Sequence, residues 1–188
     1  MRALPIGWVL PHDQAERRRQ VTIAMSRATH ADPAALVAAC VIAACTSWAL
    51  EGASPSMLLE AAAEEAREAA QAVTTEMRLA EMLTQVSAGT WEPPANGISP
   101  DPYETVAAAL RCATRATSPH SGLVGAVQLG GDTDTVAALV GGLMGCKLTA
   151  EQIRSELPWH QLVVLPEPES EIGDIAVALA TTRAIQSV

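Results

Sequence analysis

The chain has 188 residues and a formal net charge of −9 at neutral pH. Its length is enough to bury one hydrophobic core, so we expect a single domain over residues 1–188. The acidic excess argues against nucleic acid or an acidic membrane surface as a partner. Alanine is the commonest residue, and aromatic residues make up only 3%. This composition favours an all-α fold, because alanine is the residue least costly to hold in a helix.

Cysteine placement and the N-terminal residues indicate a cytoplasmic protein. Residues 1–10 lack the basic start and long apolar core of a secretion signal. Residues 34–50 carry no charge, but they are mostly alanine and fall short of the roughly 20 residues of a membrane span, so we expect a buried core helix. No Cys-x-x-Cys pair is present, and free thiols in a reducing compartment explain the four cysteines best: Cys40, Cys45, Cys112 and Cys146.

The N-terminal third is predicted to form two helices separated by a turn. Residues 13–26 form the first, with the arginine triplet 17–19 in water. Asp32 is a suitable N-cap for the second helix, and Pro33 suits its first position, after which the helix continues to Leu50. The first helix is expected to turn four apolar residues toward the core: Val21, Ile23, Ala24 and Met25.

Residues 56–86 predict one long amphipathic helix, with apolar residues from Leu58 to Leu83 at helical spacing. Glutamates cover much of its other side. Paired carboxylates can act as general acid and base, but regularly spaced glutamates on a long helix usually form its solvated face. No chemistry is therefore assigned to this set: Glu60, Glu64, Glu65, Glu68, Glu76 and Glu81.

The segment 89–102 is rich in proline and predicts a loop within the domain, followed by a helix to about residue 117. His120 and Ser121 could be drawn as a base and a nucleophile. No orienting acid lies at a recognisable spacing from them, so a turn with a helix cap is the favoured interpretation. Shorter helices are expected up to Gln128 and over 149–156, and a final helix over 172–185.

The densest group of polar side chains is the string GGDTDT at 130–135. Two glycines permit a tight turn, and an uncharged run of small residues follows at 136–146. Asp132 is a natural N-cap, while Asp134 and Thr135 fall in the first helical turn, where the helix dipole favours negative charge. Their oxygen atoms suit Mg²⁺ or Mn²⁺. Taken alone, such a string is more often only a helix cap.

Together with the small-residue helix that follows it, this string resembles the signature of the ADP-ribosylglycohydrolase family. That family includes the dinitrogenase-reductase-activating glycohydrolase, the ADP-ribosyl-arginine and ADP-ribosyl-serine hydrolases, and the J1 crystallins. The resemblance implies an all-α fold, an orthogonal multi-helix bundle, with a site for two divalent metals. It implies that Asp132, Asp134 and Thr135 are metal ligands, with Mg²⁺ or Mn²⁺ as the cofactor.

Residues that flank the string extend the resemblance to substrate binding. The segment Thr29-His30-Ala31-Asp32-Pro33 is similar to the one whose histidine lines the family's ADP-ribose cleft, which implies a substrate-side role for His30. Gly130 and Gly131 are placed beside the substrate in the same way. The family commonly has asparagine where this chain has Gln128, whose amide is one methylene further from the backbone.

Residues 1–7, MRALPIG, resemble a segment that lies mid-chain in the family. The family's phosphate-contacting loop, its Thr-Asp-Asp-Thr metal motif and the acidic residue usually assigned to catalysis have no counterpart in this sequence. We therefore expect the C-terminal part of the fold, without the family's N-terminal portion, and assign no catalytic residue. Two explanations fit this absence equally well. A second chain could supply the N-terminal half-site, or the start of this chain could be truncated.

Three functions stay open. The first is a metal-dependent glycohydrolase, or its C-terminal subunit in a hetero-oligomer, which cleaves a ribosyl bond in an ADP-ribose-like small molecule or an ADP-ribosylated protein. The second is a catalytically incomplete module that binds a ligand or a protein. The third is a hydrolase of a small nucleoside or sugar glycoside. A bundle missing one flank would also expose an apolar groove along the helix after Thr135.

Overall fold

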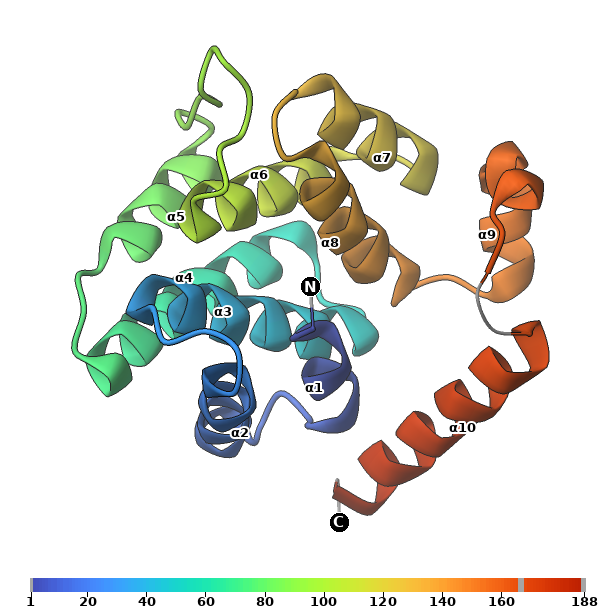
Figure 1. The fold of residues 1–188 in the computed structure, drawn as a ribbon, viewed down its shortest axis with the longest axis horizontal. Helices are drawn as coiled ribbons and strands as arrows, with labels where there is room; N and C mark the ends of the chain where they lie inside the picture. The colour runs from blue at the N-terminus through green and yellow to red at the C-terminus, as the bar shows by residue number, and fades with distance from the viewer. Residues whose placement is uncertain (1, 166–167, 187–188) are drawn as a thin grey trace.

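A computed structural model of the protein describes residues 2–165 and 168–186. These residues form an all-α bundle, as predicted (Figure 1). Across the same ranges the one extended pairing is an isolated bridge between Ile98 and Gly131. The described part of the chain holds ten α-helices and one 3-10 helix: α1 (Leu4–Val9), α2 (Ala15–Arg27), α3 (Pro33–Leu50), α4 (Pro55–Val73), α5 (Arg78–Ala88), α6 (Pro102–Arg115), α7 (Pro119–Gln128), α8 (Thr133–Gly145), α9 (Ala150–Glu156), η1 (Pro158–Leu162) and α10 (Glu169–Gln186).

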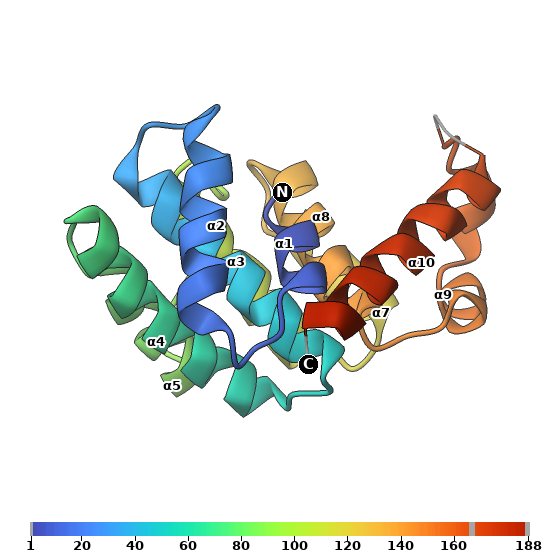
Figure 2. The ribbon, with the colours of Figure 1, turned by 90° about the horizontal axis from the view of Figure 1, so that it is seen from below.

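Helix α3 lies at the centre of the bundle. Asp32 Oδ1 accepts a hydrogen bond from the Ala34 N–H at 3.0 Å, and Pro33 occupies the first helical position, which confirms the predicted start. Helices α1, α2, α4, α6 and α8 all pack against α3, and Figure 2 shows α1, α2 and α4 around it. Its alanines let these neighbours approach closely, and Ala43 and Cys45 have no exposed surface.

By length and composition α3 would also pass as a membrane-crossing helix, and it is the one such helix in the part of the chain that the structure describes. However, 67% of that apolar stretch is buried inside the protein. Its apolar surface is therefore covered by other helices, as expected of a core helix.

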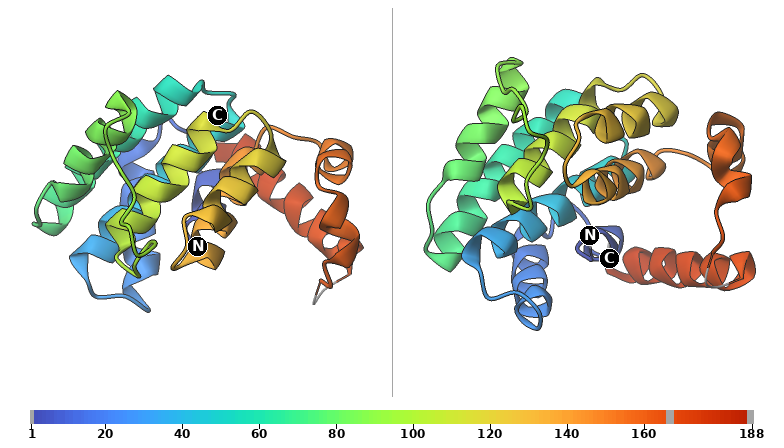
Figure 3. Two further views of the ribbon diagram at one scale, coloured as in Figure 1. Left: turned by 90° about the horizontal axis from the view of Figure 1, so that it is seen from above. Right: turned by 45° about the horizontal axis from the view of Figure 1, so that its top comes forward.

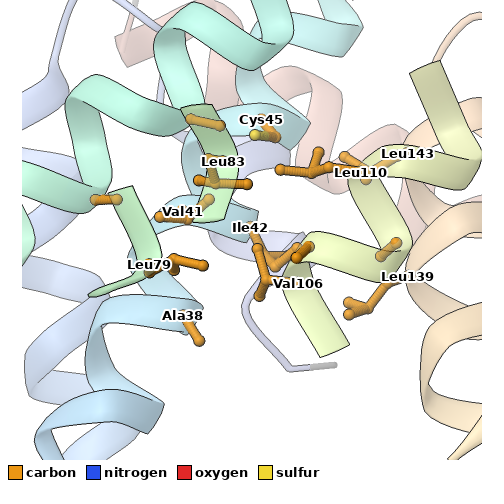
Figure 4. Packing of buried hydrophobic residues seen from close by; sticks show 14 of the residues in the cluster. Ala38, Val41, Ile42, Cys45, Leu79, Leu83, Val106, Leu110, Leu139 and Leu143 are labelled. Atoms are coloured by element: carbon orange, nitrogen blue, oxygen red, sulfur yellow. The ribbon is translucent and has the colours of Figure 1, made fainter. Parts of the chain in front are cut away.

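The core continues from α3 to α5, α6 and α8. Figure 4 shows the labelled side chains of these helices meeting in one layer. Each is at most 6% exposed, and burying one large aliphatic side chain contributes roughly 1.5–3 kcal/mol. The larger members of this layer come in pairs one turn apart or adjacent on their helices: Val41 and Ile42, Leu79 and Leu83, Val106 and Leu110, Leu139 and Leu143.

The single helix predicted over 56–86 is wrong, because two helices occupy this stretch. Helix α4 ends at Val73, and Thr74 takes a left-handed conformation with φ of 56°. Its N–H donates to the carbonyls of Ala70 and Gln71, so the turn closes α4. After the break α5 packs on α6 as well as on α4. Apolar residues keep helical spacing across the break, which is why periodicity alone does not reveal it.

The prediction that the arginine triplet and the glutamates of α4 are solvated is wrong for three side chains. Arg18 is 2% exposed and Glu65 is 4% exposed. Arg19 Nε donates to Glu65 Oε1 at 2.7 Å, and Arg18 Nη1 donates to the Pro11 carbonyl at 2.8 Å. Burial raises the pKa of Glu65 above its ordinary value despite the two arginines. The ion pair joins α2 to α4 inside the protein.

Replacing Glu65 is expected to destabilise the fold. Glu65→Gln removes the carboxylate between two largely buried guanidinium groups and leaves Arg19 with only the half-exposed Glu68 as a counter-charge, so we expect the free energy of unfolding to fall by about 3 kcal/mol. Glu64→Gln is the matched control, because Glu64 is the exposed neighbour on the same helix, and it should change stability by less than about 0.5 kcal/mol. Urea unfolding of both variants measures the difference, and equal effects would contradict the structural role of Glu65.

Most of the exposed large apolar side chains lie on the C-terminal arm, which comprises residues 150–165 and 168–186. The groove predicted along the helix after Thr135 has a counterpart in a cavity that Thr135 and Leu139 of α8 line in part. The large apolar residues of α8 face the core, with Val136 and Val140 fully buried. Figure 3 shows the arm at the side of the bundle, with the C-terminal end of α10 near α1. The arm exposes most of the large apolar side chains that face solvent: Leu162, Val163, Val164, Leu165, Ile172, Ile175, Val177 and Ile185.

Candidate active site

The string at 130–135 forms the connection from α7 to α8. Gly130 and Gly131 both take left-handed backbone conformations, with φ of 72° and 73°. The Ile98 N–H donates to the Gly130 carbonyl at 3.0 Å, and the Asp132 N–H donates to the Ile98 carbonyl at 2.8 Å. A Cβ on Gly131 would lie 2.1 Å from the Ile98 oxygen. The glycine pair therefore lets two loops touch backbone to backbone, and this contact places Asp132.

Asp132 precedes α8, but its predicted role as the side-chain N-cap is wrong. Its side chain accepts no hydrogen bond from the backbone N–H groups of the described α8. The Asp132 backbone has φ of −73° and ψ of 58°, which differs from the extended conformation of a capping residue. Asp132 Oδ1 instead accepts a hydrogen bond from Thr135 Oγ1 at 2.8 Å. The carboxylate thus stays outside the helix end.

Asp134 is exposed in the first turn of α8. The Asp132 carboxyl and, after it, the backbone N–H groups of Thr135 and Asp134 lower the pKa of Asp134 below its ordinary value. Asp134 therefore remains ionised beside a second carboxyl group and a hydroxyl.

These donors fit one side of a divalent metal. Asp132, Asp134 and Thr135 offer oxygen atoms of the kind that Mg²⁺ and Mn²⁺ prefer. Over residues 2–165 and 168–186 no group of three or more histidine, cysteine, aspartate or glutamate residues could hold a metal ion. Asp132, Asp134 and Thr135 would by themselves supply only part of a coordination shell.

A cavity of about 630 Å³ brings together residues from the two predicted motifs. His30 and Asp32, from the connection between α2 and α3, lie in its wall with Asp132 and Thr135. Helices α1, α2, α3, α6 and α8 contribute further residues to the wall. Thr29 Oγ1 lies 2.8 Å from His30 Nδ1, an interaction that orients the imidazole.

Other residues of the candidate site lie outside this wall. Asp134 and Gln128 are exposed and are not among the residues that line the cavity. Gly130 and Gly131 hold the loop in place and do not line the cavity either. The roles assigned to all four, and to His30, stay predictions.

Most residues of the wall were not assigned to the site from the sequence, among them Arg2, Asp32 and Met25. Arg2 contributes a cation to the wall. The resemblance of residues 1–7 to a segment of the family is the sequence feature that could have pointed to Arg2 as a site residue. Asp32 was interpreted only as a helix cap, which it is, but its helix begins at the cavity. Met25 was expected in the core, yet it is 62% exposed and lines the cavity.

His120 and Ser121 form a helix start, as the capped-turn interpretation predicts. Ser121 Oγ accepts a hydrogen bond from the Ser118 N–H at 3.0 Å, while Ser118 Oγ accepts one from the Ser121 N–H at 3.1 Å. The His120 ring packs against Trp159 in a tilted arrangement, with ring centroids 4.8 Å apart and an interplanar angle of 42°. Helix α7 begins at Pro119, because Ser118 is the cap.

The family model for ADP-ribosylglycohydrolases matches residues 1–186. The chain belongs to this family. A search of curated proteins found no match. The family match spans the GGDTDT string, His30 and the helices around the cavity, so the resemblance seen in the sequence is confirmed. Membership in the ADP-ribosylglycohydrolase family indicates a glycohydrolase.

The contact between the two loops can be tested by comparing the two adjacent glycines. Gly131→Ala should displace Asp132, because the added Cβ would meet the Ile98 carbonyl at 2.1 Å. Gly130→Ala meets nothing closer than 3.7 Å and carries only the strain of its left-handed backbone, on the order of 1 kcal/mol. We expect Gly131→Ala to lower the melting temperature by several degrees more than Gly130→Ala. Equal shifts would contradict the close approach.

Proposed function

We propose that this chain forms part of a metal-dependent glycohydrolase that cleaves a ribosyl glycosidic bond. The proposed substrate is an ADP-ribose-like small molecule or an ADP-ribosylated protein. One observation carries the proposal: His30, Asp132 and Thr135 share the wall of one cavity, although about a hundred residues separate His30 from the other two in sequence. Its volume is within the range of about 300–1,000 Å³ typical of small-molecule sites.

Asp132, Asp134 and Thr135 are the residues we propose for Mg²⁺ or Mn²⁺. The Asp132 carboxylate does not cap α8, it accepts a hydrogen bond from the Thr135 hydroxyl, and the pKa of Asp134 is lowered; these observations support the assignment. When bound, such cations polarise a substrate and lower the pKa of bound water. The protein's part is to hold these oxygen donors at one end of α8.

His30 and Arg2 are proposed to orient the substrate. Thr29 fixes the His30 ring through Nδ1, and this arrangement suits a hydrogen bond from Nε2 to a ribose hydroxyl. The Arg2 guanidinium is suited to a diphosphate, which it can bind through charge-assisted hydrogen bonds. Both residues line the cavity that contains Asp132.

A second chain is the proposed partner in a hetero-oligomer. The donors at 132–135 are too few to hold two small cations, and the part of the chain that the structure describes holds no larger ligand cluster. The second chain would supply the remaining carboxylates, a phosphate-binding loop and the catalytic acid. The shortage of ligands equally favours one alternative function, a module that binds a ligand without catalysis.

Removing either carboxylate should abolish metal binding and activity. We expect Asp132→Ala and Asp134→Ala to weaken Mn²⁺ binding by more than the ~10–100-fold typical of losing a hydrogen bond that merely supports a ligand. Asp13→Asn is the matched control, because Asp13 is exposed and distant from the string in sequence. The measurements are calorimetric titration with Mn²⁺ and release of ADP-ribose by the protein purified from its own cells.

Native mass spectrometry of that preparation distinguishes the two functions. A complex with a second helical chain, active in the wild type and inactive in both aspartate variants, supports the hydrolase. A lone chain that binds ADP-ribose without cleaving it supports the binding module. Full activity in both Asp132→Ala and Asp134→Ala would contradict the assignment of these residues as metal ligands.

A further inference from the structure

Helix α1 forms part of the cavity wall, but it has little intrinsic stability. Its residue Ile6 and the preceding Ala3 line the cavity. The helix spans only six residues, Leu4–Val9, and a helix that short does not persist in water without tertiary contacts. Its N-terminus has no side-chain cap from the described residues. The position of this wall therefore depends on what holds α1 from outside.

Helix α3 holds one side of α1. The backbones meet at Gly7, where a Cβ would lie 2.2 Å from the Ala43 carbonyl oxygen and 2.7 Å from Thr46 Cβ. Just after α1, the Leu10 carbonyl accepts a hydrogen bond from Ser47 Oγ at 2.8 Å. These contacts set the distance of α1 from α3, but they leave the carbonyls of its last turn to be paired.

Arg183, from α10, pairs with those carbonyls. Its Nη1 donates to the Gly7 oxygen at 2.9 Å and to the Trp8 oxygen at 3.4 Å. Its Nη2 donates to Ser47 Oγ at 3.3 Å and forms an ion pair with Glu51. The last carbonyls of a helix lack partners within the helix, and a cation there is favoured by the helix dipole. The Arg183 side chain is 16% exposed, so water screens these bonds only partly.

We propose that Arg183 is a positioning residue for the cavity. By capping the C-terminal end of α1, it fixes Ala3 and Ile6 in the wall beside Asp132 and Thr135. Arg183 itself does not line the cavity, so it acts through α1. The relevance of this wall to substrate rests on the proposed function, whereas the effect on α1 does not.

A second attachment of α10 supplies the matched control. Gln186 Oε1 accepts a hydrogen bond from Arg17 Nη1 at 2.5 Å, and the Gln186 carbonyl accepts one from the Gln14 side chain. These bonds hold the end of α10 on α2 and do not involve α1. Arg17→Ala therefore loosens α10 while it leaves the α1 carbonyls paired with Arg183.

Hydrogen exchange of the full chain, followed by mass spectrometry, tests the proposal. In Arg183→Gln we expect the amides of residues 6–10 to exchange about 10-fold faster, the change expected when hydrogen bonds from a charged group are lost. Amides of α6 should keep their protection, which shows that the core remains folded. Arg183→Lys should restore part of the protection of α1, because a cation remains at the helix end.

The same variants are then titrated with ADP-ribose in the complete assembly. We expect Arg183→Gln to weaken binding several-fold and Arg17→Ala to bind as the wild type does. If residues 6–10 exchange equally fast in Arg183→Gln and Arg17→Ala, the proposal is wrong. If the wild type itself does not bind ADP-ribose, the proposed function fails, and the exchange of α1 still decides the role of Arg183.

Discussion

The burial of α3 on nearly all sides is the constraint on which the other features depend. Because neighbouring helices cover its surface, α3 is held in place, and its two ends position the residues attached to them. The N-terminal end carries Asp32 and brings His30 to the cavity. The C-terminal end carries Ser47 and Glu51, which meet Arg183. One apolar helix thus links the candidate site to the C-terminal arm.

The small side chains of α3 also make room for the cavity. Ala35, Ala38 and Ala39 form part of its wall, and larger residues there would fill the space next to His30. The opposite wall depends on backbone contact, since Gly131 must approach Ile98 for Asp132 to reach its place. The site therefore depends on small residues in two places: the alanines of α3 leave the cavity open, and Gly131 lets Asp132 reach its position.

Charged groups in this protein serve two different purposes. Glu65 is buried, and its two arginines satisfy it, so it joins helices and is not available to a ligand. Asp132 is half-buried in the cavity wall and Asp134 is exposed, both at one end of α8, and the Asp132 carboxylate does not cap that helix. Carboxylates that the fold does not need, held close together, are the ones suited to a cation.

Features that depend on near neighbours could be predicted from the amino-acid sequence: the all-α class, the Asp32-Pro33 start of α3, the Ser118 turn and the tight loop at Gly130. Caps, prolines and glycines act within a few residues, so their effects can be predicted locally. Three features could not be predicted in this way and are seen only in the folded structure: the break at Thr74, the burial of Glu65 and the Arg183 contact with α1. Each depends on a partner distant in sequence, and helical periodicity does not report such partners.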